Sequence, residues 1–270
     1  MLSARLAWLP VTAALLLSFV ASVTPANAAD RVDARFEIFG FAGFHVLTNL
    51  TTTQETSTGY SIAMNLDTRG LAAAFVDLRS NSTVQGMIGS NGLHPDAYRA
   101  DVYRNGTQRY YGVKYQKDGN VVDDSSPPPA GVTRPSGAQV RGTVDQLTAY
   151  FLVERQLAQR GQCALVVPVF DGSELYKIHF SDVGQETLSA DRFQNFTGAA
   201  KRCEINREVI VASPDKEEST YQQGRIWYAQ LLPGHAMIPV RMEYDTAFGR
   251  VSGYLAELTA EGVHLQLMGE

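Results

Sequence analysis

Residues 164–180 read ALVVPVFDGSELYKIHF, two runs of strand type on either side of an Asp-Gly pair. Such a pair between two β-type runs predicts a hairpin with a type I′ turn, in which Asp171 and Gly172 both take positive φ. Pro168 has no amide hydrogen to donate, so either its strand lies at a sheet edge or the proline takes a position that makes no ladder hydrogen bond. His179 alternates in step with Lys177 and is expected to face water.

Similar patterns fill most of the chain. Residues 35–53 indicate either one long bent strand or a tight pair, and residues 59–70 alternate as a half-buried strand does. Asn105-Gly106 lies between two further alternating runs and is a strong hairpin signal. Five more β-type runs lie between residues 204 and 269. The sequence therefore predicts a mainly β fold, a curved antiparallel sheet of half-barrel or β-spiral form.

One α-helix is expected to cover part of this sheet, near residues 143–160. Thr143 and Gln146 fit a capping box, Asp145 suits the positive N-terminus of a helix, and Gly161 provides a left-handed stop. The segment before it, residues 123–142, is rich in Pro and Gly and predicts a surface loop. We expect one domain over residues 29–270.

The first 28 residues resemble a cleavable secretory signal. An early Arg5 precedes an apolar run, and small residues at Ala26 and Ala28 form an Ala-x-Ala site. The run is shorter than the roughly 20 residues that a membrane span needs. We therefore expect an exported, soluble protein that no longer spans a membrane after signal cleavage, located in the periplasm.

The two cysteines, Cys163 and Cys203, predict one disulfide, because an oxidising compartment favours pairing of two thiols. A loop of this length is stabilised by about 3 to 4 kcal/mol in the chain-entropy model. A nucleophilic Cys163 activated by His179 is the alternative.

Sequence motifs for catalysis are absent: there is no Gly-x-Ser-x-Gly elbow, phosphate loop, His-Glu-x-x-His helix or Cys-x-x-Cys pair. No cofactor and no metal site is predicted. Basic residues are scattered and the net charge is −5, which argues against a nucleic-acid partner. A hydrolase for envelope glycan or lipid stays open as an alternative, with His94, Asp96 and His179 as candidate groups. Glu243 is expected on a solvated charged face.

Aromatic residues recur along the first strands and one late strand. A packed core is the simpler explanation, but a curled sheet with too few side chains to fill it would leave an apolar groove for an acyl chain. The candidate groove residues are Phe36, Phe39, Phe41, Phe44, Trp227 and Tyr228.

Several blocks together give a family resemblance: GLHPDAY, the Pro-rich loop, RGTVDQLTAYFLVERQL, the Cys163 to VFDGSELY block, Cys203, RIWYAQL, and IPVRMEYDTAFGRVSGYLAEL. The chain resembles the bacterial family of domain of unknown function 3108, over most of the segment after the signal. More loosely, it resembles the β-spiral envelope-integrity proteins of the alphaproteobacterial periplasm. The resemblance implies export in a Gram-negative host and supplies no catalytic residue.

The sequence-level hypothesis is a non-enzymatic periplasmic protein that supports cell-envelope integrity by binding a lipid, a glycolipid or a protein partner. A third hypothesis is a packed β scaffold that docks a protein through an edge strand.

Overall fold

The computed structural model describes residues 30–74, 76–128, 130–213, 222–233, 236–246 and 249–269. The predicted signal, residues 1–28, lies outside these ranges. Among the described residues, no helix has both the length and the apolar character needed to cross a membrane.

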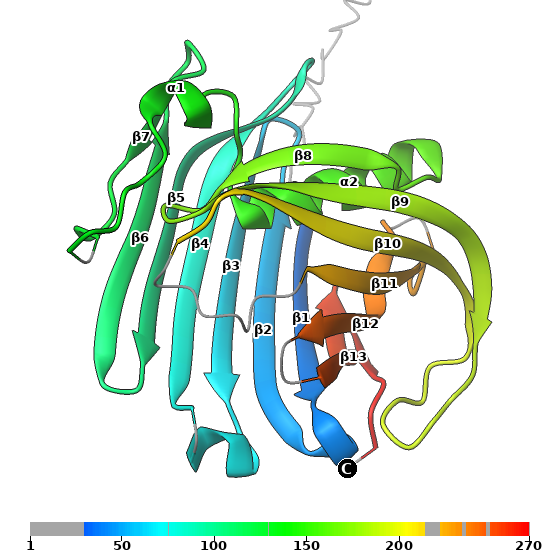
Figure 1. Ribbon diagram of the computed structural model, residues 1–270. Coiled ribbons are helices and arrows are strands. Elements are labelled where there is room, and N and C mark those ends of the chain that lie inside the picture. The colour runs from blue at the N-terminus through cyan, green and yellow to red at the C-terminus, as the bar shows by residue number, and fades with distance from the viewer. Residues whose placement is uncertain are drawn as a thin grey trace, which may run out of the picture.

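The described chain forms one antiparallel sheet of 14 strands, as the alternating patterns predict (Figure 1). The strand order is β7-β6-β5-β4-β3-β2-β1-β13-β12-β11-β10-β9-β8, and β14 pairs with β13. The strands are β1 Asp30–Phe39, β2 His45–Glu55, β3 Gly59–Thr68, β4 Leu78–Gly89, β5 Gly92–Arg104, β6 Thr107–Tyr115, β7 Val121–Asp123, β8 Leu165–Phe170, β9 Leu175–Leu188, β10 Gly198–Val211, β11 Gln223–Ala229, β12 Ile238–Thr246, β13 Gly249–Ala260 and β14 Val263–Gln266.

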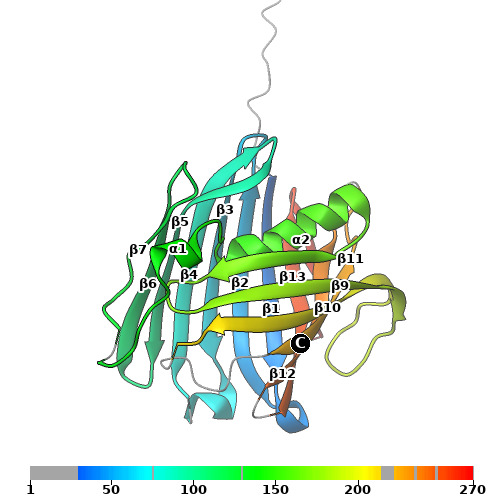
Figure 2. The ribbon, with the colours of Figure 1, turned by 45° about the horizontal axis from the view of Figure 1, so that its top comes forward.

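The sheet is curved and open, and helix α2, Gln146–Arg160, lies within the curve. Strands β8 to β10 pass across the face of β1 to β5, with α2 alongside β8 (Figures 1 and 2). Leu147 and Phe151 of α2 pack with side chains of β3 to β6, while Val153 and Leu157 pack with side chains of β8 to β11. The helix has apolar residues on two of its own faces, and each face packs on a different part of the sheet. It thus fills the interior between these two parts.

Cross-strand register defines an inner and an outer face throughout the sheet. Ile38, Gly253, Met242, Ile226 and Cys203 are successive partners on the face toward α2, which we call the inner face. Their neighbours along each strand form a second row on the opposite, outer face: Thr48, Glu37, Tyr254, Arg241, Trp227 and Arg202. Apolar packing therefore concentrates on the inner face and charged side chains on the outer one.

The two predicted hairpins end in different turns. Asn105 and Gly106 have φ of 48° and 84°, which confirms a type I′ turn between β5 and β6. Asp171 and Gly172 also connect paired strands, β8 and β9, but only Gly172 has positive φ, so the predicted turn type is wrong. The Asp171 carboxylate instead accepts hydrogen bonds from the amides of Ser173 and Glu174, at 3.1 and 2.9 Å. This Asx turn makes a four-residue loop.

That loop, residues 171–174, is buried against the opposite end of the sheet. Ser125 donates a hydrogen bond to the carbonyl of Gly172 at 3.0 Å, and its oxygen accepts from the amide of Gly112 in β6 at 2.9 Å. A Cβ on Gly172 would lie 2.6 Å from the Ser125 hydroxyl, and its φ is 84°. Glycine is therefore needed here for both conformation and close approach.

An ion pair stabilises the same loop. Arg207 Nη2 lies 2.5 Å from Glu174 Oε2, and both side chains are buried. The Arg207 guanidinium lies 3.8 Å from the centroid of the Tyr176 ring, which adds a cation–π contact. Two neighbours, the Glu174 carboxylate and the Tyr176 ring, thus stabilise the buried positive charge of Arg207 on the inner face.

The helix begins two residues later than the capping box predicts. Asp145 is the N-cap, and its carboxylate accepts from the amide of Thr148 at 2.9 Å. Thr143 instead donates to the carbonyl of Val140 at 2.7 Å, so it is not available as a cap. Gly161 ends the helix in the left-handed conformation, as expected. Burial raises the pKa of Asp145 to about 6, although the hydrogen bonds from Thr148 act against this.

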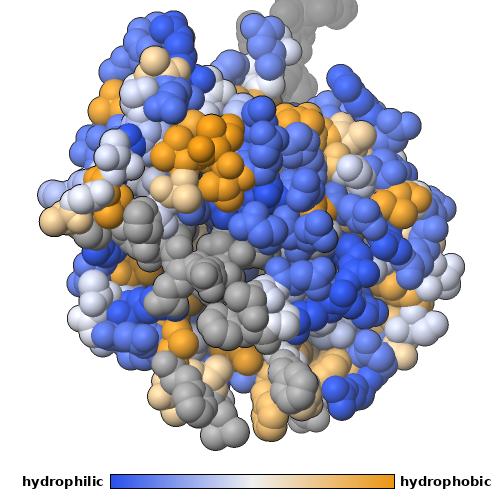
Figure 3. Space-filling model, viewed as in Figure 1, coloured by the Kyte–Doolittle hydropathy of each residue, from blue (hydrophilic) through white to orange (hydrophobic). Residues whose placement is uncertain are grey.

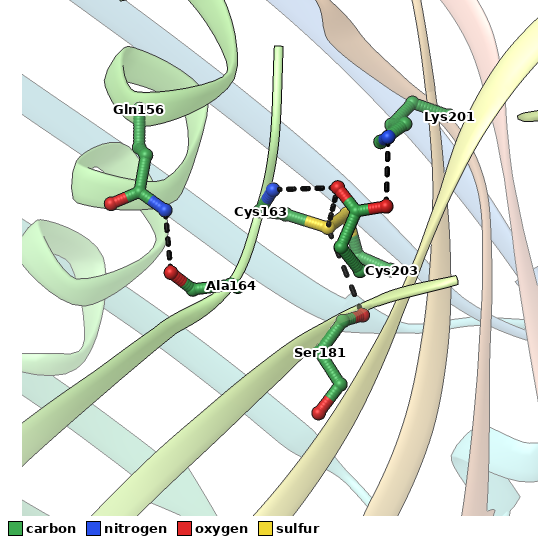
Figure 4. The surroundings of a disulfide bond; sticks show 7 residues. Gln156, Cys163, Ala164, Ser181, Lys201 and Cys203 are labelled. Atoms are coloured by element: carbon green, nitrogen blue, oxygen red, sulfur yellow. Dashed lines mark hydrogen bonds and ion pairs between the residues drawn. A yellow bond between two sulfur atoms is a disulfide. The ribbon is translucent and has the colours of Figure 1, made fainter. Parts of the chain in front are cut away.

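The predicted disulfide is confirmed: Cys163 and Cys203 are bonded and fully buried (Figure 4). Asp182 accepts a hydrogen bond from the Cys163 amide at 3.2 Å and pairs with Lys201 at 2.7 Å. Although desolvation acts to raise it, these contacts hold the pKa of Asp182 below its ordinary value. The bond ties the segment after α2 to β10, so Cys163 carries no free thiol.

Pro168 lies in an edge strand, one of the two expected arrangements. β8 is the last strand of the order, and on its free side Val144 accepts from the amide of Phe170 at 3.0 Å and donates to the carbonyl of Pro168 at 3.1 Å. This edge offers few backbone groups for a docking strand.

Candidate functional site

The six aromatic residues predicted to line an apolar groove lie in different places. Phe36 and Tyr228 are buried on the inner face in two separate core clusters. Trp227 is also buried, in the same core cluster as Phe36, but it lies on the outer face, where the Arg202 and Arg241 guanidiniums stand 5.8 and 5.1 Å from its ring centroid.

The remaining three are dispersed as well. Phe39 packs on Phe193, Phe44 is 57% exposed, and the side chain of Phe41 lies outside the described residues. The face of the molecule seen in Figure 3 is mostly hydrophilic, with apolar side chains in separate patches.

The candidate hydrolase residues lie on opposite sides of α2. His94 and Asp96 are exposed positions of β5, whose residues Leu93 and Tyr98 pack toward the helix. His179 belongs to β9, and its Nε2 lies 2.8 Å from Glu208 Oε2 on the side away from the helix. The structure does not bring these three side chains into one cleft.

A cavity of about 500 Å³ opens on the outer face, over the pairing of β1 with β13. Its lining combines charged, amide and apolar side chains: Arg35, Glu37, Phe39, His45, Glu257, Gln266, Met268 and Gly269. Alternation along β1 explains this composition, because Arg35, Glu37 and Phe39 point outward while Phe36 and Ile38 point into the core. Volumes of this size are typical of small-molecule sites.

Glu37 is the buried centre of this site, with its side chain 10% exposed. One carboxylate oxygen pairs with Arg35, and the other lies 2.7 Å from both His45 Nε2 and Thr48 Oγ1. His45 Nε2 also lies 3.1 Å from the carbonyl of Leu47. Since both neighbours are acceptors, Nε2 carries the ring hydrogen and Nδ1 of the neutral ring is an acceptor.

Arg35 lies between two carboxylates. Besides Glu37, it contacts Glu257 with Nη2 at 2.6 Å from Oε1. The hydrogen bond from Arg35 lowers the pKa of Glu257, and the same bond raises the pKa of Arg35. Glu257 is therefore stabilised as an anion, and the two carboxylates fix the direction of the guanidinium.

The walls of the cavity are held by residues distant in sequence. Phe39 packs on Phe193 with ring centroids 4.4 Å apart, and Phe193 stacks on Tyr254 at 5.3 Å. Gln266, Met268 and Gly269 form a second wall of the cavity. Leu267 fixes this segment, because its amide donates to the carbonyl of Ala256 and its carbonyl accepts from the amide of Asn195, both at 2.7 Å. The loop between β9 and β10 thus supports both walls.

A second charged cluster corrects a prediction for Glu243. Its side chain is 9% exposed, not solvated, and Arg241, Arg225 and Arg250 surround it at 2.6, 3.1 and 3.9 Å. The three arginines come from three adjacent strands, and only their pairing brings them together.

Sequence reasoning also missed Arg35, Glu37 and His45. One signal was available: Arg35 and Glu37 alternate with Phe36 and Ile38 in the second half of the strand. Charges at alternate strand positions indicate an outward face, but not a cavity. Within the described ranges, no group of three or more His, Cys, Asp and Glu side chains is arranged to hold a metal.

Comparisons with known proteins give a family and a fold. A crystal structure described as a β-barrel-like protein of domain of unknown function DUF1849 from Brucella abortus is similar, with a TM-score of 0.51 and 14% identity. The match covers 87% of this chain and 98% of that one, and shows a shared fold alone. No curated protein matches. The model of the family "Protein of unknown function (DUF3108)" matches residues 35–256, and the chain therefore belongs to the DUF3108 family.

Proposed function

We propose that this protein is a non-enzymatic binding protein of the periplasm, which supports the integrity of the cell envelope by holding a lipid, a glycolipid or a protein partner. The observation that carries the proposal is the polar cavity on the outer face of β1 and β13. The inner face of the same strands is packed by side chains, so recognition on these strands falls to the outer one.

The buried disulfide supports the location. Structural disulfides persist in oxidising compartments such as the bacterial periplasm and are rare in the cytosol. The Ala-x-Ala pattern of the first 28 residues agrees with export.

The cavity supports binding over catalysis. Arg35, His45 and Thr48 together engage both oxygens of Glu37, an arrangement that holds the carboxylate in place rather than presenting it to a substrate. Arg35 is likewise engaged by two carboxylates. Such a hydrogen-bonded network of fixed side chains suits the recognition of a ligand.

A deletion strain tests the function. We expect higher sensitivity to detergents and to large antibiotics, restored by the full gene and not by a version without residues 1–28. Fractionation of the complemented strain should place the protein in the periplasmic fraction. A deletion strain with unchanged sensitivity, or full rescue by the version that lacks residues 1–28, would contradict the proposal.

A further inference from the structure

We infer that the cavity over β1 and β13 binds a neutral saccharide of one or two rings, an inference that rests on the proposed binding function. It names the chemistry that this site recognises, the sugar portion of an envelope component.

The hydrogen-bonding groups at the cavity match hydroxyls. A hydroxyl both donates and accepts, and is therefore best met by donors and acceptors lying side by side. Arg35 donates, Glu257 accepts, and Gln266 does both, and the three occur in one cross-strand row. His45 also lines the cavity, and in the tautomer with its hydrogen on Nε2 it has an acceptor at Nδ1.

The apolar part of the lining matches the carbon face of a sugar ring. Phe39 and Met268 line the same cavity as the polar groups. Phe193 and His45 hold the Phe39 ring in place, with ring centroids 4.4 and 5.3 Å away. A fixed aromatic ring beside a few convergent polar groups is typical of a preformed site.

The charges of the cavity argue against an anion. One guanidinium faces two carboxylates, so a phosphate or sulfate would meet an excess of negative charge. A cation is a weaker candidate than a sugar, because Glu37 is buried and already contacted by three side chains and Glu257 is already paired with Arg35. A volume of about 500 Å³ accommodates a mono- or disaccharide.

The test is ligand-observed NMR on the mature chain with five separate probes: chitobiose, maltose, trehalose, inorganic phosphate and methylammonium. We expect at least one disaccharide to bind and neither ion to bind.

Two cavity variants localise the site. Gln266→Leu should weaken disaccharide binding about tenfold, as expected for the loss of one or two hydrogen bonds, and Met268→Trp should abolish it by filling the cavity. The matched control Gln85→Leu, at an exposed position of β4, should bind as the native chain does. Circular dichroism spectra of all variants should coincide.

Three results would overturn the inference: no binding by any of the three disaccharides, binding of phosphate or methylammonium without a sugar, or sugar binding unchanged in both cavity variants. Any of these leaves the deletion phenotype intact, so failure of the saccharide inference is distinct from failure of the envelope function.

Discussion

The two faces of β1 and β13 have opposite character. On the inner face Phe36, Leu255 and Leu258 are buried among apolar side chains. On the outer face, one residue away along each strand, Arg35 and Glu257 line a cavity of about 500 Å³. The same backbone thus contributes to the apolar core on one side and lines the proposed binding cavity on the other. Mutations should therefore separate the two.

The largest loss of stability is expected on the inner face, when the charge of Arg207 is removed. Arg207→Met leaves the buried Glu174 carboxylate without its guanidinium, and should lower the free energy of unfolding by about 3–5 kcal/mol. Urea denaturation measures the loss. The double variant Arg207→Met with Glu174→Gln should recover part of it, because the uncompensated charge is gone. Equal losses in the single and double variants would contradict this account.

Removal of the disulfide should cause the second largest loss of stability. Cys163→Ser together with Cys203→Ser removes a link with a sequence separation of 40, and should cost about 3–4 kcal/mol. Thermal unfolding of the native chain with and without reductant provides the matched comparison. If reduction leaves the midpoint unchanged, the bond does not stabilise the β10 region as proposed. Binding at the outer cavity should survive below the unfolding temperature.

A pH-dependent effect should follow from Asp145, which is fully buried at the start of α2. Its folded pKa of about 6 exceeds the ordinary 3.8, so the native state is most stable when this acid is protonated. The contribution is fully present below pH 3.8 and lost as pH rises through 6, a change of roughly 3 kcal/mol for two pKa units.

Asp145→Asn keeps a good N-cap and removes the titration. The native chain should lose stability between pH 4 and pH 7, and the variant should not. The free energy of unfolding of the variant minus that of the native chain should therefore be larger at pH 7 than at pH 4. Urea denaturation of both proteins at the two pH values measures this difference. If the two proteins differ by the same free energy at both pH values, the pKa of Asp145 does not change on folding.

The smallest effect is expected on the outer face. Glu257→Gln should change the free energy of unfolding by about 0.5 kcal/mol or less at pH 7, because exposed ion pairs contribute little. The native carboxylate has a lowered pKa, so its contribution is present above pH 4.5 and is lost as pH falls through the lower folded value. Thermal unfolding should show a small gap between the native chain and the variant at pH 7, and a smaller gap as the pH is lowered below 4.5. A large loss of stability at pH 7 would mean that side chains of the outer face also make a major contribution to the stability of the fold.

Features set by neighbours in sequence could be predicted. Asn105-Gly106 specifies its own turn, Gly161 ends its own helix, and the two cysteines had no other partner in the chain. Asp171-Gly172 looked equivalent to Asn105-Gly106, but the Asp171 carboxylate competes for the backbone amides of Ser173 and Glu174. Docking against Ser125 selects that alternative, and this contact is not visible in the local sequence.

The cavity depends on contacts that no local pattern contains. Arg35 and Glu257 are 222 positions apart, and they face each other only because β1 pairs with β13. The walls add Phe193 and Leu267 from two further segments. Alternation indicates which residues of β1 face outward, but the strand order decides what they meet.

That pairing also has a consequence for how the chain folds. β1 is the first described strand, and its neighbour on one side, β13, lies near the other end of the sequence. While the chain is being made, β1 can pair with β2 but not with β13, so the centre of the sheet closes only after nearly the whole chain is present. Completion of the outer cavity should therefore coincide with the last step of folding.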